Sequence, residues 1–177
     1  DEQRKSVNII RECGHNLLKL IDDILDFSKI EAGQLDTEII DSSLGKLLNS
    51  VGSLMRPKAI EKGLEFEIVE SNGLPTQIRS DPTRLQQCLI NLIGNAIKFT
   101  EKGHVYINVL LDNRDEEPYI RFDIEDTGIS IPEDKQNIIF ESFTQADGDT
   151  TRKYGGTGLG LAITRQLAGL LGGELTL

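Results

Sequence analysis

The first 33 residues carry an apolar stripe that one isolated helix has no means of burying. The residues on this stripe, at helical steps of three and four, are Val7, Ile10, Gly14, Leu17, Ile21, Ile24 and Ser28. Leu18, Leu25 and Phe27 widen it. At roughly 1.5 Å per residue, such a helix extends about 50 Å. The pattern predicts a helix of a bundle over residues 1–33, which ends at Gly33 and packs on a second helix or another chain.

The remaining residues, 34–177, mix short alternating stretches with helical ones, which predicts an α+β fold. Strands are expected at residues 34–39, 64–69, 77–80, 105–111 and 120–124, with a hairpin loop at 113–118 and an incomplete final strand at 174–177. Helices are expected from Ser42 or Ser43 to Lys62, from Pro82 to about Phe99, and from Thr157 to Leu171. We therefore predict a two-layer α/β sandwich with one helical layer, preceded by one long bundle helix.

Six apolar residues of the helix that ends at Lys62 are expected to face inward: Leu44, Leu47, Leu48, Val51, Leu54 and Met55. Pro57 lies inside that helix and Gly63 follows it. Cys13 and Cys88 fall in apolar helical patterns, which favours small core residues in a reducing compartment.

Composition excludes several functions. The formal net charge of -10 argues against nucleic acid as a partner, because phosphate backbones require clustered Lys and Arg. Apolar runs are too short to span a bilayer, and no signal peptide is present. We therefore expect a cytoplasmic location and no contact of this segment with a membrane. The spacing of His15, His104 and the cysteines does not suggest a zinc site. Both ends look like cuts within a longer parent, whose own membrane attachment the sequence leaves open.

Residues 154–161 read Tyr-Gly-Gly-Thr-Gly-Leu-Gly-Leu, a glycine-rich stretch in which a helical pattern begins. Glycine allows the backbone to approach a ligand closely, and a helix start presents free N–H groups and partial positive charge. This combination is typical of phosphate sites, although plain glycine turns are equally common.

The helix predicted from Pro82 carries a polar stripe at steps of 3, 4, 4 and 3, made of Arg84, Gln87, Asn91, Asn95 and Lys98. Asparagine is a poor helix former, so an ordinary solvated face would favour Glu and Lys instead. An asparagine oxygen suits a hard cation such as Mg²⁺, and a lysine suits phosphate. An ordinary exposed face remains the alternative interpretation.

Two further motifs follow. Asp126-Thr127-Gly128-Ile129 ends a strand, where a carboxylate is able to accept a ligand amine; a simple Asx turn is the alternative. Phe140 and Phe143 stand three residues apart before a polar, glycine-rich stretch. They suggest either the anchor of a mobile flap or a short segment packed into the core.

Together and in this order, the motifs resemble the ATP-binding catalytic domain of sensor histidine kinases. Residues 91–100 resemble the N box, 126–129 the G1 box, Phe140 and Phe143 the F box, and 156–161 the G2 box. Residues 20–33 are similar to the second helix of the family's dimerisation hairpin, and the wording of residues 143–147 and 151–156 is similar to hybrid-type kinases. The resemblance implies a Bergerat-type ATP-binding fold over residues 34–177.

The resemblance also implies roles for particular residues. Asn95 ligates Mg²⁺ on the ATP phosphates with Asn91 beside it, while Lys98, Arg152 and Lys153 contact phosphate. Asp126 accepts the adenine amino group, Gly128 allows close approach, and Phe99 lines the pocket. The full nucleotide-binding set is Asn91, Asn95, Lys98, Phe99, Asp126, Gly128, Ile131, Arg152, Lys153, Gly156, Thr157, Gly158, Leu159, Gly160 and Leu161, with residues 144–156 as the ATP lid.

The sequence departs from the family pattern in three places. Ser130 stands where a second glycine is usual, and the strand that follows a Gly-Gly-x-Leu-x-Leu ending is absent. No stretch matches the phospho-acceptor motif Ser-His-Glu-x-Arg-Thr-Pro; His15 lies in a Cys-Gly-His-Asn context, and His104 begins a strand. Both histidines are therefore expected to be structural or exposed.

The resemblance implies that Mg-ATP donates its γ-phosphoryl to a histidine that this chain lacks. The implied partners are the histidine-bearing helix of the parent, a second copy in the intact dimer, and a response-regulator receiver domain. An ATPase of the gyrase or mismatch-repair type is one alternative, although residues 84–100 offer no Asp or Glu as a general base. A nucleotide-binding interaction module without kinase activity is another.

Overall fold

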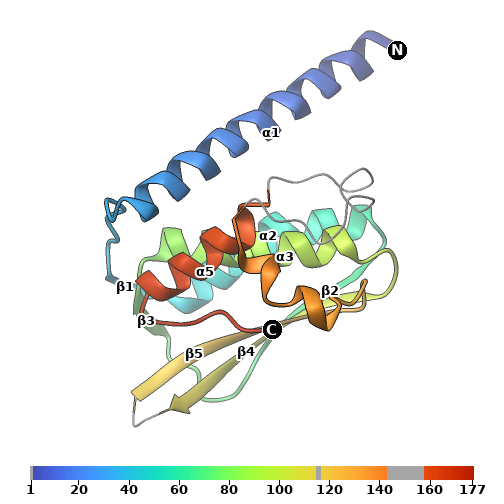
Figure 1. Cartoon of the computed structure of the whole chain (residues 1–177). Helices are drawn as coiled ribbons and strands as arrows, with labels where there is room; N and C mark the ends of the chain where they lie inside the picture. Colours follow the sequence, from blue (N-terminus) through green and yellow to red (C-terminus); the bar gives the residue numbers. More distant parts are fainter. Residues whose placement is uncertain (1, 115–116, 143–157) are drawn as a thin grey trace.

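The computed structural model describes residues 2–114, 117–142 and 158–177. Its N-terminal part is a single helix, α1 (Glu2–Glu31). Figure 1 shows α1 running over the helical side of the rest of the molecule, with its N-terminal end extending beyond it. Several large apolar side chains of α1 are exposed, among them Val7, Ile10 and Leu17. The predicted helix is therefore present, and most of its apolar stripe faces solvent in this single chain.

The rest of the described chain forms a two-layer α/β sandwich, which confirms the predicted fold class. Its elements are β1 (Ile40–Ser43), α2 (Leu44–Glu61), β2 (Glu65–Glu70), β3 (Gln77–Ser80), α3 (Pro82–Phe99), β4 (His104–Arg114), β5 (Glu117–Asp126), the short 3₁₀ turns η1 (Glu133–Lys135) and η2 (Ile138–Phe140), and α5 (Gly160–Leu170). Helices α2 and α3 cover one face of the sheet, and α5 packs against α3 (Figure 1).

The main sheet has the strand order β2-β4-β5. Strand β2 runs parallel to β4, so the connection between them crosses over through α3, whereas β4 and β5 form an antiparallel hairpin. A second, two-stranded sheet pairs β1 with β3 in antiparallel register. The core lies between the sheet and the two helices, where Met55, Ile93 and Val105 are fully buried.

The start of α3 follows the prediction made from Asp81 and Pro82. The Asp81 carboxylate accepts hydrogen bonds from the backbone N–H groups of Thr83 and Arg84, at 2.9 and 3.0 Å, and also from Glu38 N–H at 3.0 Å. Burial by itself raises the pKa of Asp81, but these three hydrogen bonds and the charge of Arg84 outweigh it, so the pKa is lowered. The cap fixes where the N-box helix begins.

Several expectations about strand and helix limits are wrong. Residues 34–39 form no strand; the β1 strand starts at Ile40, and Glu38 bonds to the Asp81 carboxylate instead of to a ladder. The β4–β5 ladder continues to the pair Arg114 and Glu117, so the hairpin loop is shorter than 113–118. Residues 174–177 are not in a strand.

Three further expectations need correction. Leu54 is 48% exposed because it lies at the margin of the buried face of α2, which is centred on Leu48 and Met55. Helix α5 begins at Gly160, so residues 158–159, which were expected to be helical, lie outside it. Cys13 is exposed on α1, whereas Cys88 is buried on α3 as expected.

Candidate nucleotide-binding site

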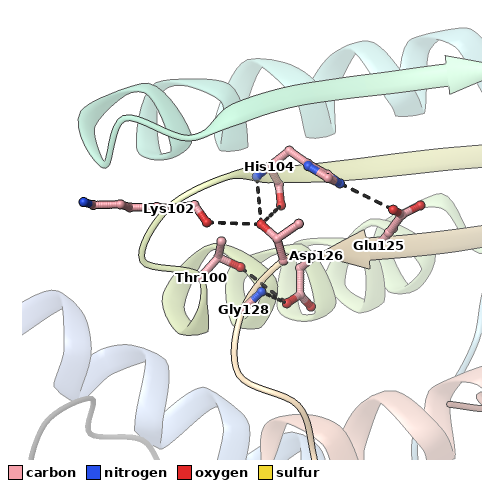
Figure 2. Close-up of polar contacts among 7 residues, drawn as sticks. Thr100, Lys102, His104, Glu125, Asp126 and Gly128 are labelled. Atoms are coloured by element: carbon pink, nitrogen blue, oxygen red, sulfur yellow. Dashed lines mark hydrogen bonds and ion pairs between the residues drawn. The ribbon is translucent and has the colours of Figure 1, made fainter.

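The carboxylate of Asp126 lies at the end of β5, where the chain turns away from the sheet. Its Oδ1 atom accepts the backbone N–H of Gly128 at 2.8 Å and the hydroxyl of Thr100 at 3.4 Å. Figure 2 shows these side chains converging beneath the start of β4. Within the described residues the Oδ2 atom of Asp126 accepts no hydrogen bond. An Asx turn thus holds the carboxylate, as the alternative interpretation expected, and still leaves one oxygen for a ligand.

The turn after Asp126 touches the C-terminal end of α3. A Cβ atom placed on Gly128 would lie 2.7 Å from the Phe99 carbonyl oxygen and 2.8 Å from Asp126 Oδ1. Any other residue would push the turn away from the helix, so glycine is required here for close approach. The G1 turn and the last turn of α3 therefore form one continuous surface.

Gly160, the first residue of α5, contacts the same helix further back. A Cβ atom on Gly160 would lie 2.6 Å from Asn91 Oδ1. The Asn91 amide donates to the Thr164 hydroxyl at 2.8 Å, and Thr164 in turn donates to the Gly160 carbonyl at 2.9 Å. Asn91 thus joins α3 to the start of α5, and its amide N–H is committed to this contact.

Asn95 stands on α3 between these two contacts. Its side chain is half-buried and makes no hydrogen bond to the described residues. One helical turn on, the Lys98 ammonium lies 4.9 Å from the centroid of the Phe99 ring. The Asn95 amide thus has no partner among the described residues, whereas the Asn91 amide N–H group is bonded to Thr164.

The first part of the polar stripe has a different role from the one expected. Arg84 and Gln87 both donate to Asp26 Oδ2 of α1, at 2.9 and 2.8 Å. Beside this contact, the Phe27 side chain is buried against Cys88 of α3, Leu159 just before α5, and Ile163 and Leu167 of α5. These two polar residues therefore hold α1 and do not belong to a ligand site.

Helix α5 begins at Gly160, inside the glycine-rich stretch of the sequence. Its N-cap residue, Leu159, provides no side-chain cap, so the leading N–H groups of the helix are suited to an anion. Gly158 adopts a left-handed φ of 70°, the Leu159 side chain is buried, and Leu161 is half-buried. Ile131 is half-buried after the G1 turn, where its carbonyl accepts from the Gln136 amide at 3.3 Å.

Some predicted site residues lie outside the described residues: Arg152, Lys153, Gly156 and Thr157, together with Phe143 and the expected lid at 144–156. The other F-box aromatic, Phe140, ends η2, and the Arg165 guanidinium of α5 stacks over its ring at 5.1 Å. Phe140, expected either to anchor a flap or to pack into the core, thus lies against α5.

Sequence reasoning missed three threonines. Thr100, Thr127 and Thr164 contact Asp126, the start of β4 and Asn91, respectively. Thr100 and Thr127 directly adjoin predicted site residues, and this adjacency was the available signal. The described residues contain no group of three or more His, Cys, Asp or Glu side chains suited to a metal ion.

A family profile described as "Histidine kinase-, DNA gyrase B-, and HSP90-like ATPase" matches residues 80–177. The chain belongs to this ATPase family. A second profile, "His Kinase A (phospho-acceptor) domain", matches residues 1–33, the segment predicted to be a hairpin helix. The two matches cover α1 and the part of the sandwich that carries the N, G1, F and G2 boxes.

Curated relatives of this family member are sensor kinases. The signal transduction histidine-protein kinase BarA of Escherichia coli K12 is 44% identical over 98% of this chain and 19% of its own length. The autoinducer 2 sensor kinase/phosphatase LuxQ of Vibrio vulnificus is 41% identical over 99% of this chain and 21% of its own. The chain thus spans about a fifth of the length of these relatives.

Solved structures of histidine kinases are also similar to this chain. Full-length ShkA in complex with AMPPNP is 38% identical, with a TM-score of 0.80, over 97% of this chain and 35% of that one. The catalytic domain of the histidine kinase ThkA is 30% identical, with a TM-score of 0.61, over 76% of this chain and 82% of that one. No helix in the described residues has the length and apolar character that crossing a membrane requires.

Proposed function

We propose that this chain is the ATP-binding catalytic part of a two-component sensor histidine kinase. In this role it binds Mg-ATP and donates the γ-phosphoryl group to a histidine carried by the parent kinase. The observation that carries the proposal is that the G1 turn and Gly160, at the start of α5, contact the same helix, at Phe99 and Asn91. These residues are eight positions apart, or about 12 Å along the helix axis. The base then lies at the Asp126 end and the phosphates lie at the α5 end.

The Asp126 carboxylate would accept the exocyclic amino group of adenine through Oδ2, because Oδ1 already has two donors. The first-turn N–H groups of α5 would bind phosphate oxygens, and Lys98 would add positive charge. Phe99 would line the pocket beside the base. Arg152, Lys153, Gly156 and Thr157 complete the proposed phosphate side.

Magnesium fits the Asn95 position. Mg²⁺ retains waters and takes much of its coordination from substrate phosphates, so one protein oxygen such as the Asn95 amide suffices. When bound, the ion neutralises charge on the phosphates during transfer. The proposal assigns Asn95 as its protein ligand and leaves Asn91 to fix the distance between α3 and α5.

Partners follow from the relatives. ThkA has been solved in complex with the response regulator TrrA, at 26% identity and a TM-score of 0.67 to this chain. We infer that the parent forms a homodimer through the hairpin that includes α1, and passes phosphate from its histidine to a receiver domain. We place the activity in the cytoplasm, with no nucleic-acid or membrane contact by this segment.

Calorimetric titration with Mg-ATP tests the proposal. Asp126→Ala should weaken binding by about tenfold or more, the value of one hydrogen bond to a charged group, and Asn95→Ala, which removes the proposed Mg²⁺ ligand, should weaken it by a similar factor. Asn49→Ala and Asp41→Ala are matched controls on exposed positions of α2 and β1, and should bind as the unmodified chain does. Equal affinity in all five proteins would refute the site.

The reaction itself is tested with labelled ATP. The chain should phosphorylate a separately supplied hairpin that bears the parent's histidine, and should not label itself. Stoichiometric acid-labile phosphate on this chain would contradict that division of roles. Steady-state hydrolysis should be slow, because α3 provides no carboxylate to activate water.

A further inference from the structure

Thr127 stands where β5 leaves the sheet. The last ladder pair joins Val105 to Asp126. One residue further on, Thr127 N–H still donates to the His104 carbonyl at 3.3 Å, but the returning bond is different. The His104 N–H donates to the Thr127 hydroxyl oxygen at 3.0 Å. The hydroxyl replaces the residue's own carbonyl as acceptor, so the backbone can turn into the G1 loop without leaving this N–H unpaired.

The same hydroxyl also donates. Its proton has two carbonyl acceptors within reach, Lys102 at 3.1 Å and His104 at 3.4 Å. Gly103, between them, has a φ of 111°, and a Cβ atom there would collide with the Thr127 side chain. The Thr127 hydroxyl therefore joins the G1 turn to the loop between α3 and β4. Figure 2 shows Lys102 and His104 at this junction.

This junction adjoins the Asp126 carboxylate, which is proposed to bind the adenine base. Thr127 lies between Asp126 and Gly128, and the hydrogen bond from Gly128 N–H to Asp126 Oδ1 closes the turn around it at 2.8 Å. With Thr100 also bonded to Oδ1, the direction of Oδ2 depends on where the turn sits. Fixing Thr127 to β4 thus fixes the direction in which Asp126 presents its free oxygen.

We propose that Thr127 is a positioning residue for base recognition, which aims the Asp126 carboxylate so that the site selects a 6-amino purine over a 6-oxo purine. A 6-oxo purine places a carbonyl oxygen against the carboxylate. Because both groups are hydrogen-bond acceptors, binding of that purine is disfavoured. This inference rests on the proposed nucleotide function. It assigns to Thr127 a share of the specificity, distinct from the affinity supplied by phosphate contacts.

The experiment compares Mg-ATP with Mg-ITP, which carries the 6-oxo base, by calorimetry. The unmodified chain should prefer ATP by at least about tenfold. Thr127→Val keeps the branched shape and removes the hydroxyl; the preference should fall by about fivefold, mainly through weaker ATP binding. Thr127→Ser restores the hydroxyl and should restore the preference. Thr83→Val, at an exposed position of α3, is the matched control.

Amide hydrogen exchange provides a second readout that needs no nucleotide. The His104 N–H should exchange faster in Thr127→Val than in Thr127→Ser, while amides in the middle of β4 keep their rates, which shows that the fold is intact. If Thr127→Val weakens ATP and ITP equally, or leaves their ratio unchanged, the positioning role is overturned while nucleotide binding stands. If the unmodified chain binds neither nucleotide, the proposed function fails as well.

Discussion

Helix α1 and the α/β sandwich bury their apolar residues to different extents. In the sandwich, Ile93 and Met55 are fully buried between helix and sheet. On α1, Ile10 is 70% exposed and Val7 62% exposed, and among the side chains of this helix that the structure describes Phe27, near the C-terminal end, is the buried one. The sandwich has a core of its own. Most of α1 has an apolar face whose stability depends on another helix.

The two regions meet at a small contact with a polar and an apolar part. Asp26 accepts from Arg84 and Gln87, and Phe27 packs beside Leu159, the residue before α5. The helix thus touches α3 and α5, the two helices that also carry the proposed nucleotide site, at other residues of α3.

Thiol labelling should give the largest difference. Cys13 is exposed on α1, whereas burial raises the pKa of Cys88 to about 12, so Cys88 remains a protonated thiol at pH 8. Cys13 should react with a disulfide reagent at least about a thousandfold faster, because Cys88 must wait for opening of the core. The Cys13→Ser variant should show the slow reaction alone. Similar rates for both thiols would mean that α3 is not packed as described.

Core truncation should give the next largest effect. Ile93→Ala should lower the free energy of unfolding by about 2–5 kcal/mol, through lost burial and a residual cavity. Ile10→Ala, the matched change on α1, should stay within about 0.5 kcal/mol. Denaturant unfolding measures both. A cost for Ile10→Ala that approaches the Ile93 value and rises with protein concentration would show that a second chain covers the α1 stripe.

The contact between the regions should give the smallest effect. Asp26→Ala leaves Arg84 and Gln87 without their shared acceptor and should cost about 1 kcal/mol, since all three side chains are partly solvated. Asp22→Ala, one turn earlier on an exposed position, should be neutral. Hydrogen exchange at the end of α1 should rise in the first variant only. Unchanged protection there would show that Phe27 alone holds the helix.

What the sequence could predict depended on local chemistry. The start of α3 was predictable because Asp81 and Pro82 are a cap and a first-turn residue, and both act within a few positions. The loss of Leu54 from the core was not, because exposure at a helix margin depends on what packs beside it. The residue types of the polar stripe on α3 indicated a binding site. Only the folded structure shows that Gln87 contacts α1 and that Asn91 contacts Thr164.

In the G1 turn, too, local contacts were predictable from the sequence and distant ones were not. Asp126 and Gly128 stand out as a pair in the sequence, and their hydrogen bond is local. Thr127 makes its contacts with residues 102–104, more than 20 positions away, so no local pattern reveals them. Functional residues that act through distant backbone groups become visible only once the strands are paired.

The most direct test of the account maps bound nucleotide onto the chain. An isotope-labelled sample titrated with Mg-ADP should show amide shift changes concentrated at Gly128, at Gly160 and in the side-chain amide of Asn95, with little change at Ile10 or Val7 of α1. This result would show both turns and the helix between them acting as one site. Shifts confined to one turn, or centred on the exposed face of α1, would contradict the account.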